Sequence, residues 1–255
     1  MVDTIKKLLS TSVKILPKTW RYSIRSSMKL HDIRQHPELN VINFHSGSKV
    51  IIDVGAHVGG FTGDVLLRAP LAQFHCFEAN PRVFSILEKN CFSYGLLNHK
   101  PRALAHNIAL GSKEEVRDFL ITKNSACSSF FTSSDQNKSW AGEFCEVSEI
   151  TPVKVTTLDA YATAHNIQDA KLLKIDTQGS ELDVLIGAAK LLTSIEYVYT
   201  EVQFVALYEG APLWTDLIRY MWGQQFFPFL VGGFCLSPEG ENLQADILFK
   251  NSRYL

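Results

Sequence analysis

The chain has 255 residues, of which 46% are hydrophobic, and its 25 basic and 26 acidic residues give a net charge of -1. These values are typical of a globular protein with a substantial core. They argue against nucleic acid as the obvious partner, because proteins that bind it usually carry a basic excess. The five cysteines are scattered and form no C-x-x-C pair, and the eight histidines lack metal-ligand spacing. This pattern favours a reducing compartment over a disulfide framework and predicts no metal site.

The N-terminal region differs in charge from the rest of the chain. Residues 1–34 hold eight basic and two acidic residues, whereas the remainder holds 17 basic and 24 acidic ones. Apolar residues recur at helical spacing in this segment, namely Ile5, Leu8, Leu9, Val13 and Leu16. Two interpretations are open: a basic amphipathic helix on an anionic membrane face, or a helix packed on the domain with its lysines in water. We therefore divide the chain into a basic, partly helical extension, residues 1–44, and a domain, residues 45–255.

Short apolar segments then alternate with helical ones along the chain. Strands are predicted at 49–54, 73–78, 105–110, 171–175, 195–200, 226–231 and 245–250, and helices at 60–68, 81–90, 157–165, 180–192 and 213–222. An insertion carries strands at 116–121 and 147–156, and between them a Ser-, Asn- and Gly-rich stretch, 122–142, that is predicted to be a mobile loop. Such alternation predicts a mostly parallel sheet covered by helices on both faces, with ligands at the carboxyl ends of its strands.

The first strand ends in a glycine turn that points to a nucleotide-type ligand. Asp53, Gly55 and Gly59 give the spacing D-x-G-x-x-x-G between a buried strand and a helix. The turn lacks the Lys-Ser/Thr ending of a P-loop, and His57 stands where a dinucleotide fingerprint needs its second glycine. An acid at the strand tip suits a cationic or amine-bearing ligand, and S-adenosylmethionine, with its sulfonium and amino groups, fits that description.

A second acidic residue follows the next strand. Glu78 ends the strand predicted at 73–78, where a carboxylate can accept hydrogen bonds from both hydroxyls of a ribose. Asn107, after the third strand, either contacts the adenine edge or is an ordinary loop residue. The residues expected to bind the cofactor are Asp53, Gly55, His57, Gly59, Phe61, Glu78, Asn80, Asn107 and Asp176.

Four stretches in this order resemble the FkbM family of S-adenosylmethionine-dependent methyltransferases. They are Ile52–Gly59, Phe77–Pro81, Leu173–Glu181 and Thr200–Phe204, and the resemblance spans about residues 49–250. The third is the most specific, because K-I-D-x-x-G-x-E after a strand is the hallmark of the family. The family usually has Glu before that glycine, and this chain has Gln178. The resemblance implies a Rossmann-like class I methyltransferase fold with a mostly parallel seven-stranded sheet. It also implies methyl transfer to a hydroxyl of a sugar, polyketide or similar molecule.

Methyl transfer to oxygen requires a positioned acceptor and a group that takes its proton. Asp176 follows a central strand and is expected to face the methyl donor, as base or as orienting group. Lys174 is costly to bury unpaired, so we expect it to pair with Asp176 or Glu201. Besides Asp176, the candidate catalytic residues are Lys174, Glu201 at the end of a strand, and Glu181 in the first turn of a helix. Capping of the helix would explain Glu181 equally well.

We therefore expect a cytoplasmic O-methyltransferase of the FkbM type that uses S-adenosylmethionine and acts on a small-molecule or glycan acceptor. An RNA methyltransferase is one alternative, against which the acidic balance of the domain argues. A module that binds the cofactor without turnover is another. Four aromatic residues either wall an acceptor pocket or belong to the core, namely Trp140, Phe204, Tyr208 and Trp214.

Overall fold

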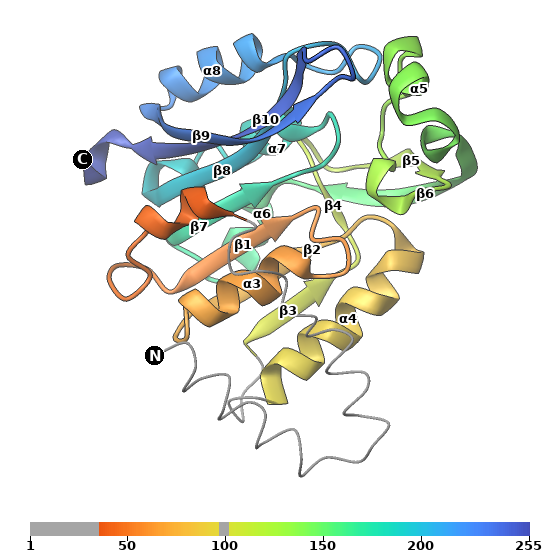
Figure 1. The fold of residues 1–255 in the computed structure, drawn as a ribbon. Helices are drawn as coiled ribbons and strands as arrows, with labels where there is room; N and C mark the ends of the chain where they lie inside the picture. Colours follow the sequence, from red (N-terminus) through yellow and green to blue (C-terminus); the bar gives the residue numbers. More distant parts are fainter. Residues whose placement is uncertain (1–35, 97–101) are drawn as a thin grey trace, which may run out of the picture. The chain divides into compact units, whose positions relative to one another are not determined.

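A seven-stranded sheet runs through the part of the chain that the computed structural model describes, residues 36–96 and 102–255 (Figure 1). Its strand order is β3-β2-β1-β7-β8-β10-β9. The strands are β1 (Val50–Val54), β2 (Gln73–Phe77), β3 (Ala103–His106), β7 (Ala170–Ile175), β8 (Ile195–Gln203), β9 (Phe226–Leu236) and β10 (Asn242–Asn251). β10 is antiparallel to both of its neighbours, and the pairs among the other five adjacent strands are parallel. The predicted α/β fold with a mostly parallel sheet is confirmed.

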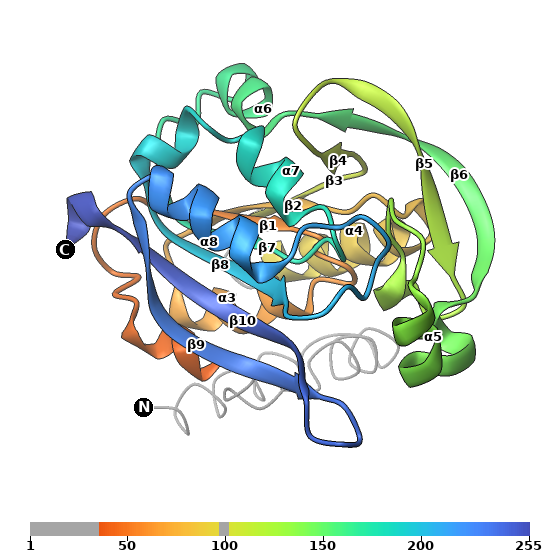
Figure 2. The ribbon, with the colours of Figure 1, turned by 90° about the horizontal axis from the view of Figure 1, so that it is seen from above.

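Helices cover both faces of this sheet (Figures 1 and 2). The 3-10 helix η1 (Pro37–Val41) and helices α3 (Gly60–Arg68) and α4 (Pro81–Leu96) share a buried cluster on one face. On the other face lie α6 (Leu158–Ala164), α7 (Glu181–Ile186) and α8 (Trp214–Gly223). Successive residues of β1 alternate between the two clusters, with Ile51 in the first and Ile52 in the second. Because both faces are buried, the strand is apolar at every position except Asp53.

The compact unit begins at His36, earlier than residue 45, where the domain was expected to begin. Leu39, Ile42 and Phe44 are buried in the cluster beneath α3 and α4. Residues 36–44 are therefore part of the domain. The predicted amphipathic helix and its membrane contact fall on residues 1–35, outside the described residues. Within the described ranges, no helix is long and apolar enough to cross a membrane.

The insertion forms a small sheet of its own, at the right in Figure 2. Its strand order is β4-β6-β5, with β4 (Ala109–Leu110), β5 (Glu115–Thr122) and β6 (Val147–Thr156). The stretch 122–142, predicted to be a loop, contains the 3-10 helix η2 (Ser125–Cys127) and helix α5 (Asp135–Ala141), and η3 (Gly142–Cys145) follows. Ser134 caps α5 by accepting from the Asn137 N–H, a local signal that the polar composition concealed. The strand predicted at 105–110 is divided between β3 and β4, which belong to different sheets.

The helix predicted at 180–192 ends early. α7 stops at Ile186, and the short 3-10 helix η4 (Leu191–Ser194) follows after a turn. At Gly187 a Cβ atom would overlap the carbonyl oxygen of Gly111, so the chain passes too close to the insertion for a side chain. The Asp159 carboxylate then accepts from the main-chain N–H groups of Lys190 and Leu191. A last 3-10 helix, η5 (Ser252–Tyr254), ends the chain.

Candidate active site

The glycine turn after β1 touches the turn after β7. Gly55 has φ 70°, and a Cβ there would overlap the carbonyl oxygen of Asp176. Gly59, with φ 87°, precedes α3, and its carbonyl accepts from the Tyr94 hydroxyl at 3.1 Å. Both positions need a left-handed backbone that glycine adopts at little cost. The two turns together form the floor at the carboxyl ends of the central strands.

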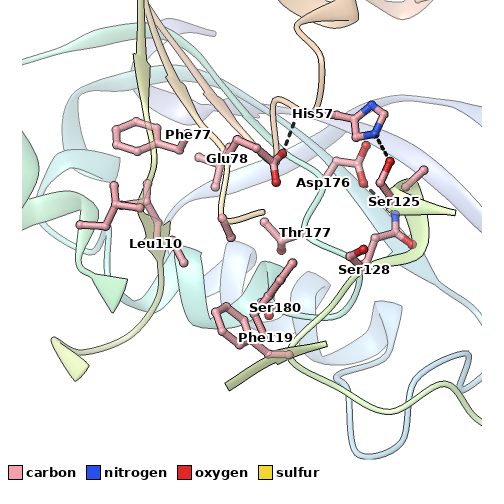
Figure 3. A pocket seen from close by; sticks show the side chains of 18 residues that line it. His57, Phe77, Glu78, Leu110, Phe119, Ser125, Ser128, Asp176, Thr177 and Ser180 are labelled. Atoms are coloured by element: carbon pink, nitrogen blue, oxygen red, sulfur yellow. Dashed lines mark hydrogen bonds between the residues drawn. The ribbon is translucent and has the colours of Figure 1, made fainter. Parts of the chain in front are cut away.

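A cavity of about 220 Å³ opens at this edge of the sheet (Figure 3). Four segments wall it: the β1 turn, the end of β2, the insertion and the β7 turn. The residues that line it include Gly55, His57, Glu78, Ala79, Phe119, Ser125, Ser128, Phe130, Asp176, Thr177, Gln178 and Ser180. The insertion contributes the aromatic residues Phe119 and Phe130 together with two serines, and the two strand turns are mostly polar, so the wall can accommodate a flat base with a polar sugar.

Glu78 lies in this wall with its carboxylate held on both oxygens. Oε2 accepts from the His57 N–H at 2.8 Å, and Oε1 accepts from the Asn80 N–H at 2.7 Å. Burial raises the pKa of Glu78 to about 7, although the two backbone hydrogen bonds act in the opposite direction. Each carboxylate oxygen has a second lone pair. The group can therefore still accept a pair of ribose hydroxyls.

Besides Asp53 and Gly59, three residues expected at the cofactor lie outside the cavity wall. The Asn107 amide donates to the carbonyls of Glu78 and Ala79, so it fixes the turn after β2. The Asn80 carboxamide oxygen accepts from a main-chain N–H in the first turn of α4. Phe61 is buried in the core cluster on the α3 side of the sheet. In this geometry Asn107, Asn80 and Phe61 stabilise the segments that form the site and do not line the cavity.

Lys174 is buried beside two carboxylates. Its Nζ lies 3.2 Å from Asp53 Oδ1 and 3.7 Å from Asp176 Oδ2, and it donates to the Gly55 carbonyl at 2.7 Å. Burial opposes the charge, but the two carboxylates outweigh it and raise the pKa of Lys174. The expected pair with Asp176 is confirmed. The pair with Asp53 was missed, although the two residues are register partners in β1 and β7.

Asp53 itself is turned away from the cavity. It is fully buried, and its Oδ2 accepts from the Thr62 hydroxyl at 2.7 Å. The acid of the glycine motif thus holds Lys174 and the start of α3. A direct contact between its carboxylate and a ligand in the cavity would require rearrangement of this pair.

Asp176 and Glu201 meet at the side chain of Gln178. Asp176 lines the cavity, and 43% of its side chain is exposed. Gln178 Nε2 donates to Asp176 Oδ1 at 2.8 Å and to Glu201 Oε2 at 3.1 Å. Burial, and then the nearby carboxylate of Asp176, raise the pKa of Glu201 well above its ordinary value. Glu201 does not line the cavity itself but accepts a hydrogen bond from Gln178, which does.

Glu181 closes the β7 turn. Its side chain is 3% exposed, and its carboxylate accepts from the N–H and hydroxyl of Thr177 and from the Gly179 N–H. Burial raises the pKa of Glu181, against these hydrogen bonds. A catalytic role for Glu181 is not supported by this geometry, because its carboxylate faces the turn. The geometry gives it a structural role.

The insertion supplies wall residues that the motifs did not indicate. Phe119 and Phe130 contact each other with ring centroids 5.1 Å apart, and the Ser125 hydroxyl lies 2.8 Å from His57 Nε2 (Figure 3). Ser180 Oγ is buried at the cavity and has no hydrogen-bond partner among the residues that the structure describes. Alternation of apolar residues in β5 was the one available signal. It predicts a strand but not which cavity the strand covers.

No group of three or more His, Cys, Asp or Glu residues is placed to hold a metal ion in the described ranges. The expectation about metal remains a prediction.

The sheet order, the glycine turn and the strand-end Glu78 define a class I methyltransferase domain. The family model described as "Methyltransferase FkbM domain" matches residues 53–228, and the chain belongs to this family. A 2-O-methyltransferase, NoeI, from Sinorhizobium fredii is 28% identical over 190 residues, which cover 72% of this chain and 73% of that protein. The crystal structure of a methyltransferase FkbM from Methylobacillus flagellatus shares the fold with a TM-score of 0.50 and 14% identity. The match covers 98% of this chain and 60% of that one, so this chain spans less than two thirds of that structure's length.

S-adenosylmethionine is the cofactor that this family membership implies, and the residues present fit it. The Glu78 carboxylate has lone pairs for a ribose, and Gly55 lets the backbone of the two turns approach closely. Ser180 offers an unsatisfied hydroxyl to a polar ligand in the cavity. These groups are the ones expected to hold the nucleoside part of the cofactor.

Proposed function

We propose that this protein transfers the methyl group of S-adenosylmethionine to a hydroxyl group of a small-molecule or glycan acceptor. The observation that carries the proposal is Asp176, a partly exposed carboxylate in the cavity wall directly after the central strand β7. A carboxylate there can accept the proton that an acceptor hydroxyl loses when its oxygen forms the new bond. The similarity to a 2-O-methyltransferase supports oxygen as the receiving atom.

The residues of the site divide the work of binding, positioning and proton transfer. Glu78 accepts hydrogen bonds from the ribose hydroxyls of the cofactor. Phe119, on the insertion side, excludes water from the adenine of the cofactor. The bound cofactor supplies an activated, electrophilic methyl group. Asp176 orients the acceptor hydroxyl, takes its proton as the carbon–oxygen bond forms and later releases that proton to water. Lys174, 3.7 Å away, keeps the Asp176 carboxylate in place.

Cofactor binding is the first test of the proposal. Calorimetry is expected to show S-adenosylhomocysteine binding in the micromolar range, on the order of -8 kcal/mol. NAD is not expected to bind, because His57 occupies the second glycine position of the dinucleotide fingerprint. Binding of NAD without S-adenosylhomocysteine would refute the nucleotide assignment.

Turnover is the second test. Methyl-labelled cofactor is offered with sugars and other hydroxylated compounds, each matched by the amine that replaces the hydroxyl, and with RNA. Transfer to the hydroxyl compounds supports the proposal. Transfer confined to the amines or to RNA contradicts it.

A further inference from the structure

The side chain of Gln178 joins two carboxylates at the ends of β7 and β8. Its Nε2 donates to Asp176 Oδ1 at 2.8 Å and to Glu201 Oε2 at 3.1 Å. Because a carboxamide nitrogen has two hydrogens, each carboxylate receives one of them. The neutral amide therefore lies between two acidic groups that would repel each other when both are ionised.

A buried hydroxyl group holds the oxygen of this side-chain amide, and a second one holds the main chain of the same residue. The Tyr208 hydroxyl donates to Gln178 Oε1 at 2.8 Å, and the Ser129 hydroxyl donates to the main-chain carbonyl of Gln178 at 2.6 Å. Tyr208 is 2% exposed and Ser129 is 1% exposed. With the tyrosine proton on the amide oxygen, the nitrogen must face the carboxylates, since the opposite orientation would set oxygen against oxygen. The orientation of the amide is thus determined by its partners.

We propose that Gln178 is a positioning residue for methyl transfer, whose amide holds Asp176 and Glu201 as hydrogen-bond acceptors in one orientation without a shared proton. The inference rests on the role proposed above for Asp176. Two neighbouring carboxylates titrate as a coupled pair, so that without a bridging donor their geometry depends on pH. An amide supplies its two hydrogens at every pH. A glutamate at this position would supply one hydrogen, and only while it is protonated.

Charged groups face Glu201 from three neighbouring elements. Asp176 follows β7, Glu181 begins α7, and Asp246 is the register partner of Glu201 in β10. Burial is the main cause that raises the pKa of Glu201, and these three carboxylates raise it further. The positive charge of Lys174 opposes the rise. The hydrogen bond from the bridging amide favours the ionised form and also opposes the rise. Loss of that bond should therefore be visible in the titration of Glu201.

Two substitutions separate positioning from shape. Gln178→Ala removes the bridge, and we expect single-turnover methyl transfer to fall roughly 10- to 100-fold at every pH, because misplaced groups cost rate on that scale. The Kd for S-adenosylhomocysteine should stay within about threefold, because the ribose acceptor Glu78 is untouched. Gln178→Glu keeps the shape. Its rate should approach that of the wild type at low pH and fall as the pH rises and the third carboxylate ionises.

Gln168→Glu is the matched control. Gln168 is exposed and precedes β7, at the opposite end of the strand from Asp176. The Gln168→Glu variant adds the same charge as Gln178→Glu at a position away from the site, so its pH–rate profile should overlay that of the wild type. A wild-type rate in Gln178→Ala, or a Gln178→Glu profile that overlays the control, overturns the proposal.

A titration that needs no acceptor completes the test. In protein labelled with 13C at the glutamate carboxyl carbons, NMR follows the pKa of Glu201 in the wild type and in Gln178→Ala. We expect this pKa to be higher in the variant, because the carboxylate loses a hydrogen-bond donor. An unchanged pKa in a folded variant contradicts the bridge.

Failure of this inference can be told apart from failure of the proposed function. If Asp176→Asn loses turnover while both Gln178 variants behave like the wild type, only the positioning role is wrong. If Asp176→Asn turns over normally, the proposed base is wrong, and the NMR titration alone then decides whether Gln178 controls the carboxylates.

Discussion

The main-chain N–H of His57 donates to Glu78 Oε2 at 2.8 Å, so the glycine turn after β1 and the end of β2 form one surface. The Asn80 N–H holds the other oxygen at 2.7 Å. With one donor on each oxygen, the carboxylate is fixed before a ligand arrives. A preorganised acceptor improves affinity because less conformational freedom is lost on binding.

Removal of this carboxylate should weaken cofactor binding. We expect Glu78→Ala to reduce the affinity for S-adenosylhomocysteine by roughly 2–3 kcal/mol, the scale of lost charge-assisted hydrogen bonds. Calorimetry measures the change. Glu88→Ala, at an exposed position in α4, is the control and should bind like the wild type. Equal affinity in folded Glu78→Ala protein would show that another residue accepts the ribose.

The same carboxylate should make binding depend on pH. Burial raises the pKa of Glu78 to about 7, and only the ionised form accepts two hydroxyl donors. Affinity for S-adenosylhomocysteine should therefore be full above pH 7 and fall as the pH drops below it, by up to about tenfold per unit. In Glu78→Gln this dependence should disappear. Affinity that is flat from pH 8 to about pH 5.5 in the wild type is the contrary result.

Local patterns predicted the framework of the site well. The β1 turn, Glu78 and Asp176 all lie at strand ends, and the apolar runs and glycine spacing that mark those ends are features of consecutive residues. The pairing of Lys174 with Asp53 could not be predicted in this way. Asp53 was expected to bind the cofactor, and its burial against Lys174 depends on how β1 and β7 are aligned, which no local pattern contains.

The buried pair of Lys174 and Asp53 makes a prediction about stability. Lys174→Met leaves Asp53 as a buried charge without its closest cation, and the free energy of unfolding should fall by roughly 3–5 kcal/mol. The double variant Lys174→Met/Asp53→Asn should recover part of this loss, because no buried charge then lacks its partner. Denaturant unfolding of the three proteins measures both effects. A double variant less stable than Lys174→Met would mean that the pair is not what matters.

The residues that the insertion contributes to the cavity wall also could not be predicted from local sequence patterns. Phe119 and Ser125 lie far along the chain from the glycine turn, and the fold of the insertion brings them to the cavity. The stretch 122–142 was read by its polar composition, whereas the Ser134 cap and burial of Asn137 make part of it helical. A local cap and a buried side chain thus determined a structure that the composition alone did not indicate.

A histidine cluster outside the site predicts loss of stability in acid. The Tyr161 hydroxyl lies 2.8 Å from His75 Nδ1 and 2.7 Å from His106 Nε2. Burial lowers the pKa of both histidines from 6.5 to about 4. Because the unfolded chain binds protons first, this stability is present above pH 6.5 and is lost as the pH falls towards 4.

Unfolding measured across that range tests the cluster. In His75→Phe the fall of the free energy of unfolding with decreasing pH should be shallower by up to about 1.4 kcal/mol per unit. His45→Gln, at an exposed position, should keep the wild-type slope. Identical slopes in all three proteins would rule out the histidine cluster as the cause.

Single-turnover methyl transfer by Asp176→Asn, at saturating cofactor and with a hydroxyl acceptor found in the labelled screen, tests the central claim most directly. The substitution keeps the shape of the side chain and removes its basicity. We predict that the variant folds, binds S-adenosylhomocysteine within a few-fold of the wild type and loses about 10²–10⁴-fold in rate, as expected for a lost general base. Near-normal turnover with intact cofactor binding would contradict the account and would make Glu201, next to the same amide, the residue to test as the base.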